Sequence, residues 1–143
     1  MVLVCLVFFG FLTLIGEQAG RAPKLAADCT TPKLKLETTK PKLGSLLTFS
    51  VAGPADRRYV VALDAAALSP KPGGGYDVRP KPGADPAQVI VSSAITTTKC
   101  LGSGRIGLPV DAGEHTITLF DVSDATAAAT VVTAIPITVT ALH

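Results

Sequence analysis

The chain has 143 residues, a length that fits one domain. Its net charge at pH 7 is only +2, and the densest basic groups are pairs such as Lys33 with Lys35 and Arg57 with Arg58. This distribution excludes the basic stripe that nucleic-acid binding needs, so we predict no nucleic-acid partner. Aliphatic residues are plentiful and Trp is absent, which favours a core of strands carrying Val, Ile and Leu.

The first segment is an uninterrupted apolar run from Val2 to Ile15. At about 15 residues it is shorter than the roughly 20 that span a bilayer as a helix, and it matches the apolar region of a secretory signal peptide. We therefore predict a signal peptide over residues 1–22, with a signal anchor as the alternative, since no Lys or Arg precedes the run. Four small residues fit the cleavage site: Ala19, Gly20, Ala22 and Ala27.

The cysteines indicate the compartment of the mature chain. Cys5 leaves with the signal peptide, and Cys29 and Cys100 remain as an even pair. In an oxidising compartment such a pair predicts a disulfide, and two free buried thiols are the alternative. The bond closes a loop of about 70 residues, for which the chain-entropy model gives about 4 kcal/mol.

Residues 23–143 are predicted to form a single domain that begins with two strands. After an extended lead-in, Lys33–Glu37 alternates charged and apolar residues, the pattern of an edge strand whose Lys side chains discourage edge-to-edge pairing. Residues Ser45–Ala52 predict the second strand, with its large apolar side chains on one face.

The third strand and a change of composition follow. Residues Arg58–Leu63 have apolar side chains in both alternating sets, as expected where both faces of a strand are covered. The segment 69–86 is rich in Pro and Gly, and only Tyr76–Val78 within it suits a brief strand. Because Pro lacks a backbone donor and Gly loses entropy on ordering, we predict a mobile or polyproline-II surface loop there.

The next part of the chain contains a formal nucleotide motif. Residues Val89–Thr98 restore strand character, and Gly102–Gly107 then matches the spacing GxGxxG. The dinucleotide fingerprint needs a helix directly after a parallel strand, whereas the residues that follow lead into another strand pattern. We therefore interpret these glycines as a turn and predict no nucleotide cofactor.

Residues His115–Phe120 give the clearest strand pattern, and they follow the turn residues Asp111–Gly113. The alternation predicts a half-buried strand. Residues Val131–Thr140 form the last predicted strand, where Pro136 indicates an edge position or a bulge. About seven short strands between Gly and Pro turns predict an all-β chain, an immunoglobulin-like or fibronectin-like antiparallel β-sandwich.

Residue types that carry chemistry are few. His115, beside Glu114 at a strand start, is expected to be a solvated or hydrogen-bonded surface histidine rather than a catalytic base. Asp121 and Asp124 are too few carboxylates for calcium and are typical of turn capping. We therefore predict no catalytic, metal or cofactor site, and a chain that acts through contacts with other proteins.

Three segments resemble the delta subunit of the translocon-associated protein complex of the endoplasmic reticulum. Residues Ala112–Asp121 are similar to its late AG-x-x-x-[VI]-x-x-FD strand, Cys29–Pro32 to the C-x-x-P after its signal peptide, and Ile135–Val139 to its closing Pro-containing strand. The second cysteine departs from that pattern, because this chain has Cys100 and no cysteine on the strand that contains Val51.

The resemblance implies a non-catalytic domain in the lumen of the endoplasmic reticulum, where it contacts other subunits beside the protein-conducting channel and assists translocation. Attachment to the membrane would then require a partner or an anchor beyond His143. The alternative is a secreted or cell-surface immunoglobulin-like module for adhesion or ligand binding.

Overall fold

The computed structural model describes residues 22–108 and 111–141, so all of the predicted signal peptide except Ala22 lies outside the described residues. The described part of the chain contains ten strands and one short 3-10 helix. The strands are β1 (Lys33–Leu36), β2 (Leu46–Ala52), β3 (Arg58–Leu63), β4 (Ala65–Pro70), β5 (Tyr76–Pro80), β6 (Ile90–Val91), β7 (Ile95–Thr96), β8 (Leu101–Gly107), β9 (Gly113–Asp121) and β10 (Thr130–Val139). The helix η1 (Pro86–Gln88) precedes β6.

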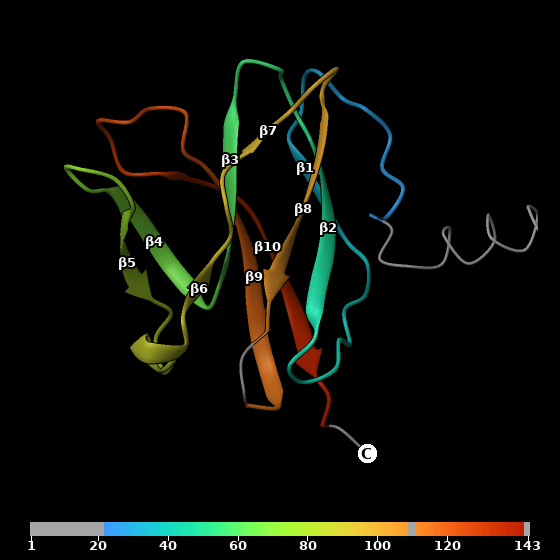
Figure 1. The fold of residues 1–143 in the computed structure, drawn as a ribbon, viewed down its shortest axis with the longest axis vertical. Helices are drawn as coiled ribbons and strands as arrows, with labels where there is room; N and C mark the ends of the chain where they lie inside the picture. Colours follow the sequence, from blue (N-terminus) through green and yellow to red (C-terminus); the bar gives the residue numbers. More distant parts are fainter. Residues whose placement is uncertain (1–21, 109–110, 142–143) are drawn as a thin grey trace, which may run out of the picture.

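Two antiparallel sheets face each other across a shared core (Figure 1). The first sheet has the order β1-β2-β8, and the second has the order β10-β9-β3-β6, with β7 also paired to β3. Phe49 and Leu47 of β2 meet Val61 of β3 and Leu119 of β9 in this core. The predicted all-β antiparallel architecture is confirmed, and the two facing sheets are consistent with a sandwich.

Several strands lie where the sequence predicts them. β1 is an edge strand, β2 buries alternate apolar residues, and β3 is covered on both faces. β10 is an edge strand, the first of the two alternatives that Pro136 indicated. The register shift with β9 lies between Val131 and Thr133, away from Pro136, which pairs regularly with Thr116. Predicted strand Val89–Thr98 is instead divided into β6 and β7, which is one reason why the described strands exceed the predicted seven.

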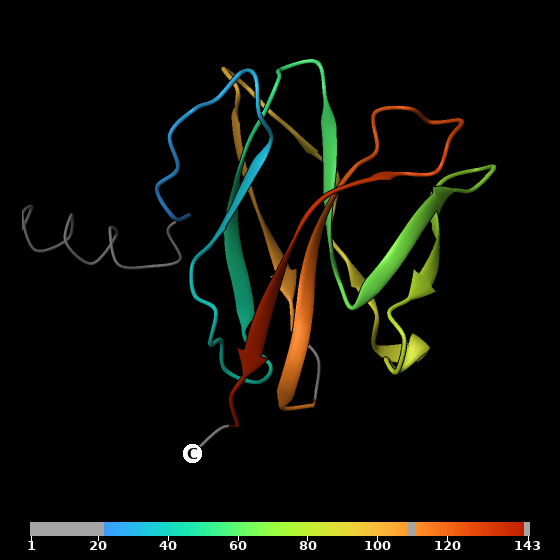
Figure 2. The same cartoon turned by 180° about the vertical axis from the view of Figure 1, so that it is seen from behind.

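Within the segment 69–86, the predicted brief strand at Tyr76–Val78 is confirmed as part of β5, whereas the predicted mobile or polyproline-II loop is wrong for residues 69–80. β4 and β5 form an antiparallel hairpin with its turn at Lys71–Gly75, where the Lys71 amide donates to the Gly75 carbonyl at 3.0 Å. The hairpin extends to one side of the two sheets (Figure 2). Its fully buried Leu68 packs with Val60 and Phe120 in a second apolar cluster, which holds the hairpin in place.

This hairpin also corrects the prediction of a half-buried β9. Ile117 and Leu119 of β9 belong to the core between the sheets, while Phe120 belongs to the cluster under the hairpin. All three side chains are fully buried. Alternation located the strand correctly, but the second cover comes from a segment whose composition did not suggest it.

The interpretation of Gly102–Gly107 as a turn is wrong, because these residues lie in strand β8. A Cβ atom on Gly104 would lie 2.9 Å from Cζ of Phe49, and one on Gly102 would lie 2.9 Å from Cγ2 of Ile95. The glycines therefore make room for core side chains. No helix follows β8 in the described residues, so the dinucleotide fingerprint is absent from this place.

Candidate functional site

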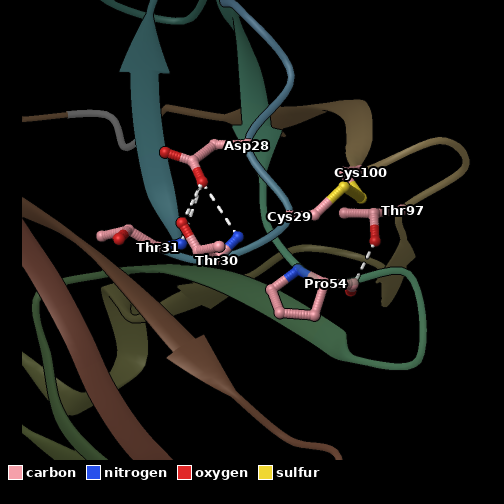
Figure 3. The surroundings of a disulfide bond; sticks show 7 residues. All are labelled: Asp28, Cys29, Thr30, Thr31, Pro54, Thr97 and Cys100. Carbon is pink, nitrogen blue, oxygen red and sulfur yellow. Dashed lines mark hydrogen bonds between the residues drawn. A yellow bond between two sulfur atoms is a disulfide. The ribbon is translucent and has the colours of Figure 1, made fainter.

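A disulfide joins the lead-in to the turn between β7 and β8 (Figure 3). Cys29 and Cys100 have Cα atoms 5.1 Å apart, which confirms the predicted pairing. Lys99 and Cys100 both have positive φ, 53° and 65°, as the two central residues of a tight hairpin turn require. Disulfides persist in oxidising compartments, so the chain is a secreted or lumenal protein.

Polar contacts fix the lead-in beside this bond. The Asp28 carboxylate accepts hydrogen bonds from the Thr30 amide at 2.9 Å, the Thr30 hydroxyl at 2.7 Å and the Thr31 amide at 3.0 Å. These bonds hold the pKa of Asp28 well below its usual range, and the bond from the Thr30 hydroxyl has the largest effect. The Ser50 hydroxyl donates to the Pro23 carbonyl at 2.5 Å, so the lead-in lies along the outer face of the first sheet.

Of the two alternatives predicted for His115, solvated or hydrogen-bonded, the structure shows the hydrogen-bonded one, with the side chain more buried than expected. Its Nδ1 lies 2.6 Å from Oδ2 of Asp64, and its side chain is only 11% exposed. Its Nε2 lies 3.0 Å from the backbone carbonyl of Asp111. Its two ring nitrogens therefore have different partners, and the imidazole is held between Asp64 and Asp111.

Asp64 organises this cluster from the junction of β3 and β4. It adopts a positive φ of 55°, a conformation that Asp tolerates because its short side chain bonds locally. Its Oδ1 accepts the Thr116 amide at 2.9 Å, and its own amide donates to the Thr116 carbonyl at 2.8 Å. Lys81 completes the group by donating from Nζ to the Thr116 hydroxyl at 2.8 Å.

An open cleft of about 330 Å³ lies beside these residues, and its charged lining includes Lys81, Asp85 and Glu114. A His–Asp pair next to a cleft suggests a general base, yet Nε2 of His115 is occupied by a backbone carbonyl rather than facing a nucleophile. The contacts instead connect β9 to the β3–β4 junction. The sequence contains one signal of this cluster that sequence reasoning missed: Asp64 is the single charged residue between the apolar runs 59–63 and 65–68.

The predicted turn-capping roles of Asp121 and Asp124 are confirmed. Oδ1 of Asp121 accepts the Ser123 amide at 2.9 Å and its hydroxyl at 2.5 Å. Oδ1 of Asp124 accepts the Thr126 amide at 2.9 Å and its hydroxyl at 2.7 Å, and the hydroxyl bond is the main reason why the pKa of Asp124 is lowered. Both carboxylates are thus engaged in their own turns.

Across residues 22–108 and 111–141, no group of three or more His, Cys, Asp or Glu side chains is arranged to hold a metal ion. No helix in the same ranges is long and apolar enough to cross a membrane. Several clefts open on the described surface.

One of these clefts, of about 280 Å³, lies beside strand β8. Residues 92–96 line one side and residues 103–105 the other, with Phe49 between the sheets. β8 is the last strand of its sheet, and its pairing with a neighbouring strand is to β2 on one side only. We treat this edge and its cleft as the candidate binding site.

No family model matches the chain, and no curated protein matches it in a sequence comparison.

Proposed function

We propose that this chain is a non-catalytic, immunoglobulin-like subunit of the endoplasmic reticulum lumen that works through contacts with other proteins. The observation that carries the proposal is the disulfide at Cys29, which supports an oxidising compartment. Cys29 also begins the C-x-x-P segment that resembles the delta subunit of the translocon-associated complex. Compartment and resemblance therefore support the same assignment.

The strand order supports the immunoglobulin-like part of the proposal. β1, β2 and β8 lie in one sheet and β3, β9 and β10 in the other. Counted along the chain, this division corresponds to the A-B-E and C-F-G strands of an immunoglobulin domain. The two further segments that resemble the delta subunit lie in β9 and β10, which are paired neighbours with Pro136 opposite Thr116.

Localisation and crosslinking of the full chain test the proposal. The protein, tagged after its last residue and expressed in cells with a secretory pathway, should be retained in the endoplasmic reticulum. Crosslinking followed by mass spectrometry should join it to subunits of the translocon-associated complex or of the channel. Recovery in the reticulum with no such crosslinks would contradict the assignment to that complex.

A secreted or cell-surface binding module is the second candidate. The same disulfide and the same two-sheet body support it equally, because both are common in extracellular modules. Accumulation of the intact chain in the culture medium would favour this candidate over the first.

The non-catalytic part of the proposal has its own test. The contacts of His115 to Asp64 and Asp111 support a structural role for the imidazole. Substituting His115→Ala should therefore lower stability without removing any enzymatic activity. Hydrolytic activity in the purified protein that disappears in this variant, while the fold persists, would overturn the proposal.

A further inference from the structure

The backbone of β8 presents an unpaired edge. The Gly53 amide donates to the Cys100 carbonyl at 3.2 Å, and the Leu108 amide donates to the Ser45 carbonyl at 3.1 Å. In an antiparallel pair the backbone hydrogen bonds to one neighbour recur at every second residue. The backbone amides and carbonyls of the even-numbered residues of β8 therefore face β2. The amides and carbonyls of Ser103, Arg105 and Gly107 consequently face away from the sheet.

Strand β7 approaches the start of this edge at Gly102, and beyond it a cleft lies beside Ser103, Gly104 and Arg105. The 280 Å³ cleft is bounded by the β6–β7 connection, where Ser93 and Ala94 are exposed. On its inner side, Gly104 packs directly against the ring of Phe49, which is fully buried in the core. The edge thus offers free backbone amides and carbonyls beside an open cleft, and such main-chain groups are what an added strand pairs with.

Charge indicates what kind of strand would fit. Arg105 is exposed on the outer face of the sheet, opposite Thr48 of β2, and has no salt-bridge partner among the described residues. Lys99 is exposed at the turn before β8. A carboxylate directly across from Arg105 on an added strand would form a favourable cross-strand pair.

A second copy of this chain fits the edge less well. Antiparallel pairing of two β8 edges centred on Arg105 would set the two guanidinium groups opposite each other, which is destabilising. Charge therefore favours an acidic segment of another protein over self-association.

We propose that the β8 edge of this protein binds an extended acidic segment of a partner protein, which adds to the first sheet as a further strand beside Ser103, Arg105 and Gly107. The proposal rests on the proposed role in protein contacts and specifies the site and the chemistry of the partner. It concerns the isolated domain, so its test does not depend on the compartment.

The first experiment measures binding of two capped synthetic peptides to the purified, oxidised protein. One has the sequence Val-Thr-Val-Glu-Val-Thr-Val, and the other has Lys in place of the central Glu. The acidic peptide should bind more tightly and should slow hydrogen exchange at the amides of Ser103, Arg105 and Gly107. Protection confined to β1 or β10, or no binding at millimolar peptide, would overturn the proposal.

Charge reversal with a matched control tests the role of Arg105. Arg105→Glu should weaken the acidic peptide roughly tenfold and favour the Lys peptide, because it turns a cross-strand attraction into repulsion. Lys35→Glu makes the same change of charge on β1, on the outer face of the same sheet, and should leave both affinities nearly unchanged. Equal effects of the two variants would mean that only net charge matters and would overturn the assignment to β8.

Removal of one edge donor tests the backbone contact. Ser103→Pro deletes an amide that faces the open edge, a position where proline is tolerated in strands. The variant should retain its circular dichroism spectrum and lose binding of the acidic peptide. If sedimentation instead reveals a dimer of the original chain that Ser103→Pro abolishes, the occupant is a second copy and the proposal is wrong. Crosslinks in the reticulum that avoid β8 would overturn this site alone and leave the proposed function standing.

Discussion

Tyr59 carries a buried hydroxyl for which the described residues provide no hydrogen-bond partner. Burial raises the pKa of Tyr59, and the nearby Asp121 carboxylate adds to the effect. We predict that Tyr59→Phe leaves the free energy of unfolding unchanged or raises it by about 1 kcal/mol, because it removes a desolvated polar group while keeping the ring. Urea unfolding of both proteins measures the difference. A loss of more than about 1 kcal/mol would show that the hydroxyl is satisfied.

Asp28 should make the anchoring of the lead-in sensitive to acid. Because its pKa is lowered in the folded chain, the ionised form contributes stability above the usual pKa of Asp. That contribution is lost as the pH falls below the usual value, near 4, toward the lowered one. Hydrogen exchange of residues 22–31 between pH 6 and pH 2.5, corrected for the intrinsic rate, should reveal progressive loosening.

The variant Asp28→Asn provides the control for this pH effect. It keeps an acceptor oxygen for Thr30 and Thr31 but has no charge to titrate, so its lead-in should loosen less over the same pH range. Identical pH profiles for the two proteins would contradict the assigned role of the Asp28 carboxylate.

Local sequence patterns predicted the roles of single residues whose partners are close in the chain, but not the contacts of residues whose partners are distant. The roles of Asp121 and Asp124 followed from local spacing, because a capped turn is built within three residues. The partner of His115 lies 51 positions away at Asp64, and no local pattern connects the two. Contacts of this range depend on how β3 and β9 pair, which only the assembled sheet reveals.

Substitution by alanine, which adds one methyl group, should distinguish the roles of two glycines in strand β8. Gly104→Ala should lower the free energy of unfolding by about 1–3 kcal/mol, since its Cβ would lie 2.9 Å from Phe49 in the core. Gly107→Ala is the matched control, because no atom lies within 4 Å of its added Cβ. Thermal and urea unfolding should therefore distinguish the variants. Equal losses would indicate that strand propensity, not packing against Phe49, governs β8.

The β4–β5 hairpin yields the next prediction. Leu68 is fully buried under it, whereas Leu46 at the start of β2 is 62% exposed. Leu68→Ala should cost about 2–5 kcal/mol, the usual range for a buried leucine. Leu46→Ala should change the free energy of unfolding by less than about 0.5 kcal/mol. Unfolding of both variants tests whether the hairpin is part of the folded core; a small effect at Leu68 would make it a dispensable appendage.

The errors at this scale share a physical cause. Pro and Gly predict irregular structure from local conformational preference, yet both occur in strands where packing outweighs that preference. Pro70 and Pro80 end β4 and β5 at positions that tolerate the missing donor, and Gly102 and Gly104 admit Ile95 and Phe49. Alternation predicted the buried face correctly in β2, where one apolar set faces the core, and in β9 it located the strand but not its second buried face.

For the whole molecule, composition and alternation were sufficient for an all-β antiparallel architecture, because both are averages over many residues. The pairing of Cys29 with Cys100 followed from counting two cysteines, not from geometry. The open edge of β8 could not be predicted, since it depends on which strands are neighbours in the sheet. Sequence therefore gave the class of the fold, while the candidate binding site came from its topology.

The disulfide connects distant parts of the fold, because it joins the lead-in to a turn 71 positions away. Replacing both Cys29 and Cys100 by Ser should lower the free energy of unfolding by about 4 kcal/mol through the greater entropy of the unfolded chain. Domains typically have about 5–15 kcal/mol in total, so the variant should remain folded but marginal. Urea unfolding of the variant and of the oxidised original chain measures the loss, and the original chain in the presence of a reductant should unfold like the variant.

Hydrogen exchange would show where that loss of stability is localised. Residues 22–31 should open first in the double variant, because the contacts of Asp28 and the Ser50–Pro23 bond then hold the lead-in alone. The turn at Lys99 and Cys100 should also loosen, since both residues keep a positive φ that non-glycine residues rarely adopt. Protection of the buried amides of β9 should fall only as far as global stability does. If β9 opened together with the lead-in below the global unfolding transition, the disulfide would be supporting the second sheet as well as clamping the first.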